Sequence, residues 1–144
     1  MRDRFSLLVV VVLTAALAAC GGSGTSRPAN IPQPDLDARL AHELFFGSQD
    51  NAPATINITV RNRAATPINV RRIEIDSPGM AQYTIIRNNR FYNQVVSPGE
   101  EANIGQVVTV VTTTSRPTEP LQIRAIVEFE AAGTRWREIV MARQ

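Results

Sequence analysis

Apolar and polar residues alternate along most of this 144-residue chain after position 35, and this period of two most limits its fold. In the clearest case, Thr55 to Arg61, Ile56, Ile58 and Val60 share one side and polar residues share the other. Successive side chains of a strand point to opposite faces, so such a segment buries one face of a sheet. Similar segments recur to the end of the chain with turn residues about every 8–12 positions, which predicts an all-β domain.

The predicted strands share this alternation or a high content of Val, Ile, Thr and aromatic residues. They span 36–46, 55–61, 68–75, 83–86, 91–96, 103–113, 121–130 and 135–141. The first also fits a helix, because Leu36, Leu40 and Leu44 are four apart and Asp35 could cap it. We prefer a strand there because everything after it is typical of β structure. In the last strand, the side that faces inward stays open.

One strand changes the phase of its alternation. Ile68 and Val70 share one parity, whereas Ile73 and Ile75 share the other. A β-bulge at Arg71-Arg72 would return all four side chains to one face of the sheet. The alternative is a strand that passes from one sheet to the other.

Turn residues separate the strands. Ser77-Pro78-Gly79 and Ser97-Pro98-Gly99-Glu100 are typical of type II turns, in which Pro fixes one φ and Gly accepts a positive φ. Residues 47–53 and Asn62–Pro67 are predicted as loops, and Ala131–Thr134 as a hairpin connection. Seven to eight short strands joined in this way predict an antiparallel β-sandwich.

Three of these segments resemble a known group of domains. Thr59–Asn62, Thr66–Val70 and Ser97–Glu100 resemble immunoglobulin-like or fibronectin-III-like bacterial modules. They are also similar to the LEA type 2 domain, although the Asn-Pro pair of that domain is Asn62-Arg63 here. The resemblance implies an immunoglobulin-like sandwich that binds or scaffolds without catalysis.

The first 19 residues have the three parts of a secretory signal. Two arginines lie in the charged start, Met1 to Arg4, and an apolar run follows from Leu7 to Ala19. That run is too short to cross a bilayer, which takes roughly 20 helical residues. We therefore predict a cleaved signal peptide over residues 1–19.

The end of this run holds the only cysteine of the chain, Cys20. Leu17-Ala18-Ala19-Cys20-Gly21 resembles the bacterial lipoprotein signal, or lipobox. The resemblance implies lipidation of the Cys20 sulfur, cleavage before Cys20 and acylation of the new amino group. Two or three acyl chains anchor a protein stably, whereas one does so only marginally. Gly21 is not Asp, so the resemblance implies the periplasmic face of the outer membrane in a Gram-negative host.

The rest of the chain divides into a linker and one domain. Residues 20–34 are predicted as a flexible tether that packs no core, because they are rich in Gly, Ser and Pro. A coil of this length has an r.m.s. reach of roughly 20 Å. Residues 35–144 form the predicted sandwich, which must fold without a disulfide.

Charge and motifs exclude several classes of function. All 15 basic residues are Arg, and removal of the signal leaves 13 of them against 12 acidic residues, which argues against nucleic-acid binding. The single histidine, His42, is predicted in the core or at its rim, and no cluster suited to a metal accompanies it. Glu128 and Glu130 share the outer side of one strand, where solvation explains them. We predict no cofactor and no enzymatic activity.

One group of residues is a candidate partner-binding face, because arginines and aromatic residues recur around neighbouring turns. The group comprises Arg61, Arg63, Arg71, Arg72, Tyr83 and Tyr92, with Arg87, Arg90 and Phe91 nearby. As a hypothesis, this face contacts anionic lipid or a cell-wall polymer. The alternative, which we prefer, is a solvated edge that discourages strand pairing.

The sequence thus predicts a lipid-anchored, non-enzymatic binding or assembly module of the bacterial cell envelope, with an envelope protein as its partner. One alternative is a periplasmic carrier that holds an apolar ligand between the two sheets. A carboxylate-based hydrolase is the least favoured alternative.

Overall fold

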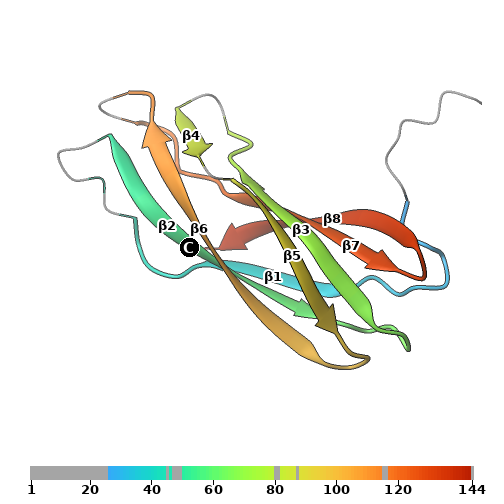
Figure 1. The fold of residues 1–144 in the computed structure, drawn as a ribbon. Helices are drawn as coiled ribbons and strands as arrows, with labels where there is room; N and C mark the ends of the chain where they lie inside the picture. The colour runs from blue at the N-terminus through green and yellow to red at the C-terminus, as the bar shows by residue number, and fades with distance from the viewer. Residues whose placement is uncertain are drawn as a thin grey trace, which may run out of the picture.

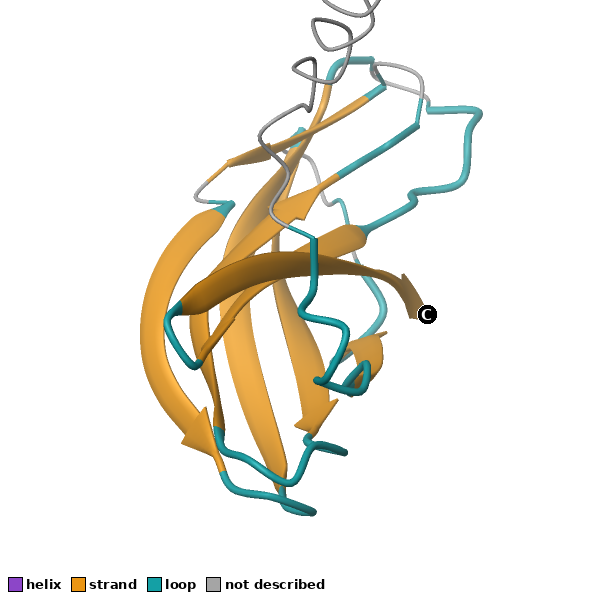
Figure 2. Ribbon diagram, turned by 90° about the vertical axis from the view of Figure 1, so that its right-hand side faces the viewer, coloured by secondary structure: helices purple, strands orange, loops and turns teal. Residues whose placement is uncertain are grey.

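The computed structural model describes residues 26–44, 46, 50–79, 82–86, 88–114 and 117–143. Within them every regular element is a strand (Figure 2). The strands are β1 (Asp35–Leu40), β2 (Asn51–Arg61), β3 (Ile68–Asp76), β4 (Tyr83–Ile86), β5 (Asn89–Val96), β6 (Glu101–Thr112), β7 (Arg124–Ala131) and β8 (Thr134–Arg143). The predicted all-β class is confirmed. The predicted signal peptide and Cys20 lie outside the described residues.

The eight strands form two layers (Figure 1). Sheet A has the order β4-β6-β2-β1, and sheet B has the order β8-β7-β3-β5. All pairings are antiparallel except a short parallel contact, Ala38 with Ala142 and Arg39 with Arg143, through which β1 joins β8. A constant-type immunoglobulin domain has the same arrangement, with four strands facing three, and β5 adds a fourth strand to the second sheet. The predicted immunoglobulin-like sandwich is confirmed.

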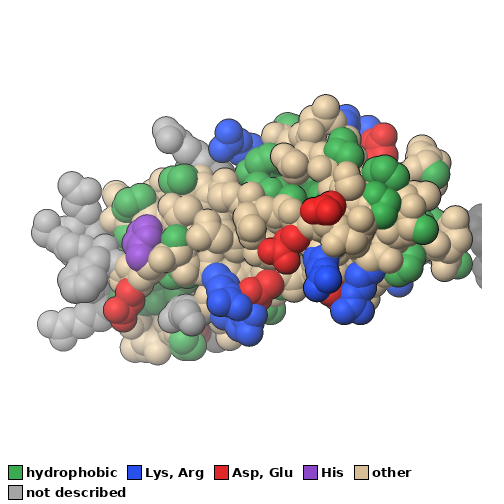
Figure 3. All heavy atoms as spheres, turned by 90° about the horizontal axis from the view of Figure 1, so that it is seen from below, with side chains coloured by type: hydrophobic (Ala, Val, Ile, Leu, Met, Phe, Trp, Pro, Cys, Tyr) green, Lys and Arg blue, Asp and Glu red, His purple; other side chains and the backbone are tan. Residues whose placement is uncertain are grey.

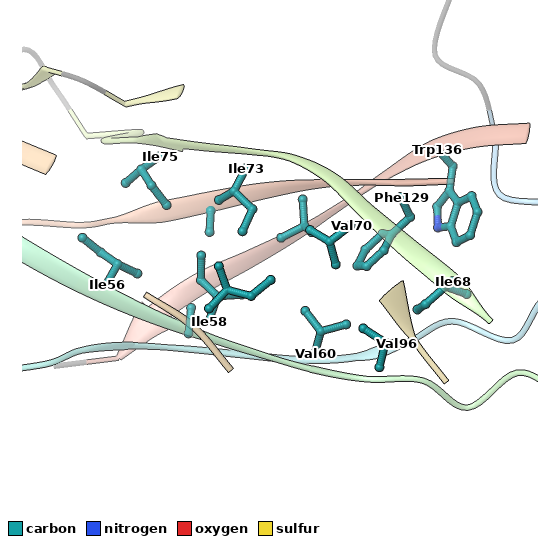
Figure 4. Close-up of a cluster of buried hydrophobic side chains, with 14 of the residues drawn as sticks. Ile56, Ile58, Val60, Ile68, Val70, Ile73, Ile75, Val96, Phe129 and Trp136 are labelled. Atoms are coloured by element: carbon teal, nitrogen blue, oxygen red, sulfur yellow. The ribbon is translucent and has the colours of Figure 1, made fainter. Parts of the chain in front are cut away.

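Apolar side chains from the two sheets fill the space between them (Figure 4). Ile56, Ile58 and Val60 are fully buried, as their alternation predicts. The ring of Phe129 stacks on Trp136 at 5.5 Å across β7 and β8. This contact sets the inward side of β8, which the sequence left open.

The side of β8 opposite to Trp136 is exposed. Ile139 is 60% exposed and Met141 is 46% exposed, whereas Trp136 is 1% exposed. Burial of the largest side chain therefore outweighs that of two smaller ones on the other parity.

The predicted β-bulge in β3 is confirmed. Val70 pairs with Phe129 and Arg72 pairs with Glu128, its neighbour, so Arg71 is the extra residue. Because of this insertion, both Val70 and Ile73 are fully buried. The two arginines project from the outer side of sheet B instead of interrupting the core.

Asn62 is a buried polar residue in the loop between β2 and β3. Its Nδ2 donates to the carbonyls of Thr66 (2.8 Å) and Val96 (3.0 Å), and its Oδ1 accepts from the Ala64 N–H (2.8 Å). Its backbone N–H donates to Glu100, and its carbonyl accepts from Gly99. The hydrogen bonds of one side chain and its backbone therefore join two connections that cross between the sheets.

The two predicted type II turns have different outcomes. Gly99 has a φ of 76°, and the Glu100 N–H donates to the Ser97 carbonyl at 3.0 Å, so the turn before β6 is confirmed. Gly79 has no positive φ, so the prediction of a type II turn at Ser77-Pro78-Gly79 is wrong. That chain segment leads from sheet B to the far edge of sheet A and does not form a hairpin.

Three predicted boundaries are wrong. β1 ends at Leu40, and residues 41–44 and 46 form no strand. β2 begins within the predicted loop, at Asn51, because its partner β6 is long enough to pair with it there. β7 begins at Arg124 and not at 121, although Ile123 is buried.

The predicted tether contributes to the core at its end. Ile31 is 4% exposed and belongs to the hydrophobic core. The Arg27 guanidinium donates to the Ile31 carbonyl and forms an ion pair with Glu138 of β8 at 3.3 Å. The prediction that residues 20–34 pack no core is therefore wrong for Ile31. We call residues 27–31 the strap.

We expect Asn62→Ala to lower the free energy of unfolding by about 2–4 kcal/mol, because it leaves a buried N–H and two buried carbonyls without their side-chain partner. Urea unfolding, followed by the fluorescence of the only tryptophan, Trp136, measures the change. Asn57→Ala is the matched control, since Asn57 is exposed on the outer side of β2. Equal effects of the two substitutions would contradict a structural role for Asn62.

The hairpin between β7 and β8 offers a second test. Ala132 and Gly133 have φ values of 49° and 76°, as in a type I′ turn, and Ala has no preference for a positive φ. Ala132→Asn should therefore raise the free energy of unfolding by about 0.5–1 kcal/mol, whereas Gly133→Ala should lower it by a similar amount. The same urea experiment measures both. A loss of stability in Ala132→Asn would contradict the turn assignment.

Candidate functional site

The residues of the predicted partner-binding face do not form one surface. Arg61 ends β2 on the outer side of sheet A, and the guanidinium of Arg63 lies 2.6 Å from the Asp35 carboxylate. Tyr83 lies in β4, where its hydroxyl donates to the Glu119 carbonyl at 2.9 Å. These three residues are separated from those of β3 and β5, because β2 and β4 belong to the other sheet.

Arg71 and Arg72 do come together, on the outer side of β3, whereas Tyr92 of the neighbouring β5 turns inward to the buried Gln106. The guanidinium of Arg71 donates to Asn93 Oδ1 at 2.9 Å and lies 3.5 Å from Glu130. Arg72 lies 3.0 Å from the Glu74 carboxylate. These contacts engage both arginines of the bulge within the molecule.

Aromatic residues of β5 cover some of these arginines. The Arg72 guanidinium lies 5.7 Å from the centre of the Phe91 ring, and Phe91 is 75% exposed. The Arg90 guanidinium lies 5.5 Å from the centre of the Tyr92 ring. In the described part of the chain no carboxylate forms an ion pair with Arg90. Arg87, which the sequence places nearby, lies outside the described residues.

Most of the charge on the outer side of sheet B is neutralised locally. The Glu128 carboxylate lies 3.3 Å from Arg137, and Glu130 lies 2.8 Å from Arg135. On this face Arg124 also lies 2.5 Å from Asp76. Glu128 lies on the outer side of its strand, as the sequence predicts, but ion pairs with arginines and not solvation alone account for it. An anionic surface would have to compete with these carboxylates for the arginines.

The opposite side of the molecule is mixed as well. Seen from below Figure 1, acidic and basic side chains are interspersed over this side (Figure 3). Asp37 of β1 contacts both Arg39, at 2.7 Å, and Arg143 of β8. The mixture of signs does not provide a basic patch for an anionic polymer.

Three groups have pKa values displaced by their surroundings. The hydrogen bond from Arg143, together with that from Arg39, holds the pKa of Asp37 below its ordinary value of 3.8. Burial raises the pKa of the Tyr92 hydroxyl above 10. The hydrogen bond to Asp76 raises the pKa of Arg124. Each cause is an ordinary structural contact, so these shifts do not indicate a catalytic centre.

A second candidate is a hollow at one end of the sandwich, with a volume of about 580 Å³. Polar and apolar surface share its lining, which comes from the end of β1, the residues after it and the segment before β7: Leu40, His42, Glu43, Leu44, Phe46 and Leu121. The sequence predicts His42 in the core or at its rim; it is exposed and lines this hollow, so its placement in the core is wrong. It leaves the core because β1 ends two residues before it.

The described residues hold no group of three or more His, Cys, Asp or Glu side chains suited to a metal ion. The same residues include no helix that could cross a bilayer. Apolar side chains fill the space between the sheets, where the carrier alternative placed an apolar ligand.

No protein-family model matches the sequence, and no curated protein does either. Three solved structures are similar in fold to this chain. A FixG-related protein from Vibrio parahaemolyticus has a TM-score of 0.43 and 11% identity over 79% of this chain and 98% of its own. A protein from Archaeoglobus fulgidus has a TM-score of 0.43 and 12% identity over 76% and 92% of the two chains.

The third is the GAE domain of GGA2p from Saccharomyces cerevisiae, with a TM-score of 0.39 and 15% identity over 81% of this chain and 92% of its own. At this level of similarity the three structures carry no information about what this chain binds.

The contact between Asp37 and Arg143 predicts a pH dependence. A carboxylate whose pKa is lower in the folded state stabilises the fold above its unfolded pKa, and this contribution is lost as the pH falls through the folded value. We expect Asp37→Asn to melt at a lower temperature than the unsubstituted protein at pH 7, and the difference to shrink below pH 3.8. Thermal unfolding over this pH range measures it.

Glu43→Gln controls for the change of net charge, because Glu43 has no ion pair in the described part of the chain. A difference for Asp37→Asn that persists undiminished at about pH 2 would show that its effect is not the titration of the carboxylate.

Proposed function

We propose that this protein is a lipid-anchored, non-enzymatic binding or assembly module of the bacterial cell envelope. The observation that carries the proposal is the lipobox-like Leu17-Ala18-Ala19-Cys20, which follows an apolar run after a charged start. Cys20 is the only cysteine, so its use as a lipid attachment point conflicts with no disulfide. The outer membrane, on its periplasmic face, is the proposed address in a Gram-negative host.

The domain supports a role in binding rather than in chemistry. Its core is filled, and its half-buried outer carboxylates Glu128 and Glu130 are engaged by arginines, which leaves little for a hydrolase that depends on two free carboxylates. A free strand edge and several exposed apolar side chains remain on its surface. Such features are typical of surfaces that bind other proteins.

The end hollow is the one observation that favours the carrier alternative, in a changed form. Its apolar lining, from Leu40, Leu44, Phe46 and Leu121, could hold a small apolar group, with His42 and Glu43 at its rim. A ligand would then lie at the end of the sandwich and not between its sheets. A fluorescent fatty acid should then bind the domain, and Leu44→Arg should abolish this binding.

Mass spectrometry of the protein purified from bacterial membranes tests the anchor. We expect a chain that begins at Cys20 and carries two or three acyl groups, whereas Cys20→Ser should release the protein from the membrane fraction. An unmodified thiol or a chain that begins at Met1 would contradict the proposal.

Gly21→Asp tests the address. Since Asp after the lipidated cysteine is typical of lipoproteins retained in the inner membrane, this substitution should move the acylated protein from the outer to the inner membrane fraction on a density gradient. An unchanged distribution of Gly21→Asp would contradict the proposed outer-membrane address and leave the anchor itself in place.

A further inference from the structure

β5 is the free edge of sheet B, because β3 pairs with one side of it and no described strand pairs with the other. Its sequence, Asn-Arg-Phe-Tyr-Asn-Gln-Val-Val, has no Pro or Gly and a single charge, that of Arg90. Proteins usually protect long edge strands with prolines, bulges or several charges. The other free edge, β4, has only four residues. β5 is therefore the longer free edge of the described domain. Its one irregularity lies in the middle, where Tyr92 and Asn93 are opposite the single residue Arg71 of β3.

Contacts with the interior hold β5 in place. The Tyr92 hydroxyl lies 3.3 Å from Oε1 of the buried Gln106, whose Nε2 donates to the Asn88 carbonyl at 3.1 Å. Val96 is 2% exposed and belongs to the core. An edge that is already ordered loses little conformational entropy when it pairs with another strand.

The outer side of β5 is apolar on both sides of one asparagine. Phe91 is 75% exposed and Val95 is 54% exposed, and Asn93 lies midway between them. Asn93 Oδ1 accepts from Asn69 and Arg71 of β3, so its side chain also lies on the outer side. The three positions are thus arranged symmetrically about Asn93.

The backbone of the edge has the same symmetry. The Asn88 carbonyl accepts from the Ile75 N–H of β3, so Asn88 turns its backbone polar groups towards β3. An antiparallel strand turns these groups alternately to its two sides. The side chains of Phe91, Asn93 and Val95 lie on the outer side and that of Tyr92 on the inner side, so the alternation continues across the register shift opposite Arg71. The N–H and C=O groups of Phe91, Asn93 and Val95 therefore point to the free edge.

We infer that two copies of this protein pair through β5 as antiparallel neighbours, with Asn93 on the two-fold axis. In this register Phe91 of each copy lies opposite Val95 of the other, and aromatic–aliphatic cross-strand pairs are favourable. The two Arg90 side chains would be roughly 20 Å apart, because six residues of strand separate them. Pairing would join the two B sheets into one sheet of eight strands.

A second copy fits this edge better than another partner because the edge complements itself. A two-fold axis requires the same patch on both chains, and the order apolar, Asn, apolar meets that requirement without placing like charges opposite each other. The inference deepens the assembly role proposed above. Anchoring on one membrane would raise the effective concentration of the copies, which suits a contact of modest area.

Disulfide cross-linking in membranes tests the pairing and its register. The full-length protein carrying Asn93→Cys is oxidised in isolated bacterial membranes and analysed without reductant. Residues opposite each other on the axis have Cα atoms about 5.5 Å apart, within disulfide range, so a dimer of twice the chain mass is expected. Phe91→Cys is the matched control, because its two copies would be roughly 14 Å apart. It should remain monomeric, whereas Phe91→Cys combined with Val95→Cys should cross-link.

Equal cross-linking of the Asn93→Cys and Phe91→Cys proteins, monomer in both, or a product of a different mass would overturn the inference. The unsubstituted chain, with Cys20 alone, shows any dimer that forms through an unacylated Cys20. The mass of the acylated chain tests the anchor, and the cross-link at position 93 tests the pairing. Because the two measurements are separate, either proposal can be contradicted without the other.

A charge on the edge provides a further check. Val95→Glu in the Asn93→Cys background should abolish the dimer, and adding Phe91→Arg should restore it, because the register places the two charges opposite each other. Val107→Glu, on an exposed residue of sheet A, should leave the dimer unchanged. Melting curves followed by Trp136 fluorescence verify that each variant is folded. Failure of the Phe91→Arg substitution to restore the dimer in a folded protein would contradict the register.

Discussion

The fold depends on the hydrogen bonds of Asn62, a polar residue that is buried away from water. The chain changes sheet several times, and two of these crossings are the connection from β2 to β3 and the connection from β5 to β6. Each crossing leaves backbone groups without a strand partner, and buried groups of this kind are costly. Asn62 serves both crossings, since it bonds Thr66 and Ala64 in the first connection and Val96, Gly99 and Glu100 in the second. An apolar residue of the same size could fill the space but could not supply these hydrogen bonds.

Much of the fold could be predicted from the sequence, because burial on one face of a strand leaves a visible period. Even the β-bulge at Arg71 could be predicted, since an inserted residue shifts that period. The failures occur where no period exists. Ile31 is a single apolar residue among prolines, so nothing local indicates that it enters the core. Gly79 and Gly99 both follow Pro. Only Gly99, which lies in the short connection from β5 to β6, has the positive φ of a type II turn.

The candidate site could be predicted less well, because residues close in sequence lie on opposite sides of a sandwich. The loop at Asn62 sends the chain from one sheet to the other, so Arg61 and Arg71 face outward in opposite directions. Cross-strand neighbours, which decide whether an arginine is available, come from distant parts of the sequence. Glu130 beside Arg71 is an example. The free edge of β5 was missed for the same reason, since the order of strands in a sheet is not local information.

The strap links the two proposals. If Cys20 is acylated, residues 21–26 separate the lipid from Arg27, and six residues span at most roughly 20 Å. The described chain begins at the same end of the sandwich as the β7–β8 hairpin (Figure 1). A two-fold axis at Asn93 reverses β5, so the two copies of this end would lie at opposite ends of the pair. Both can remain within reach of one bilayer only if the strands run roughly along the membrane. A strap that stays packed against Glu138 therefore favours a pair lying flat over one that stands upright.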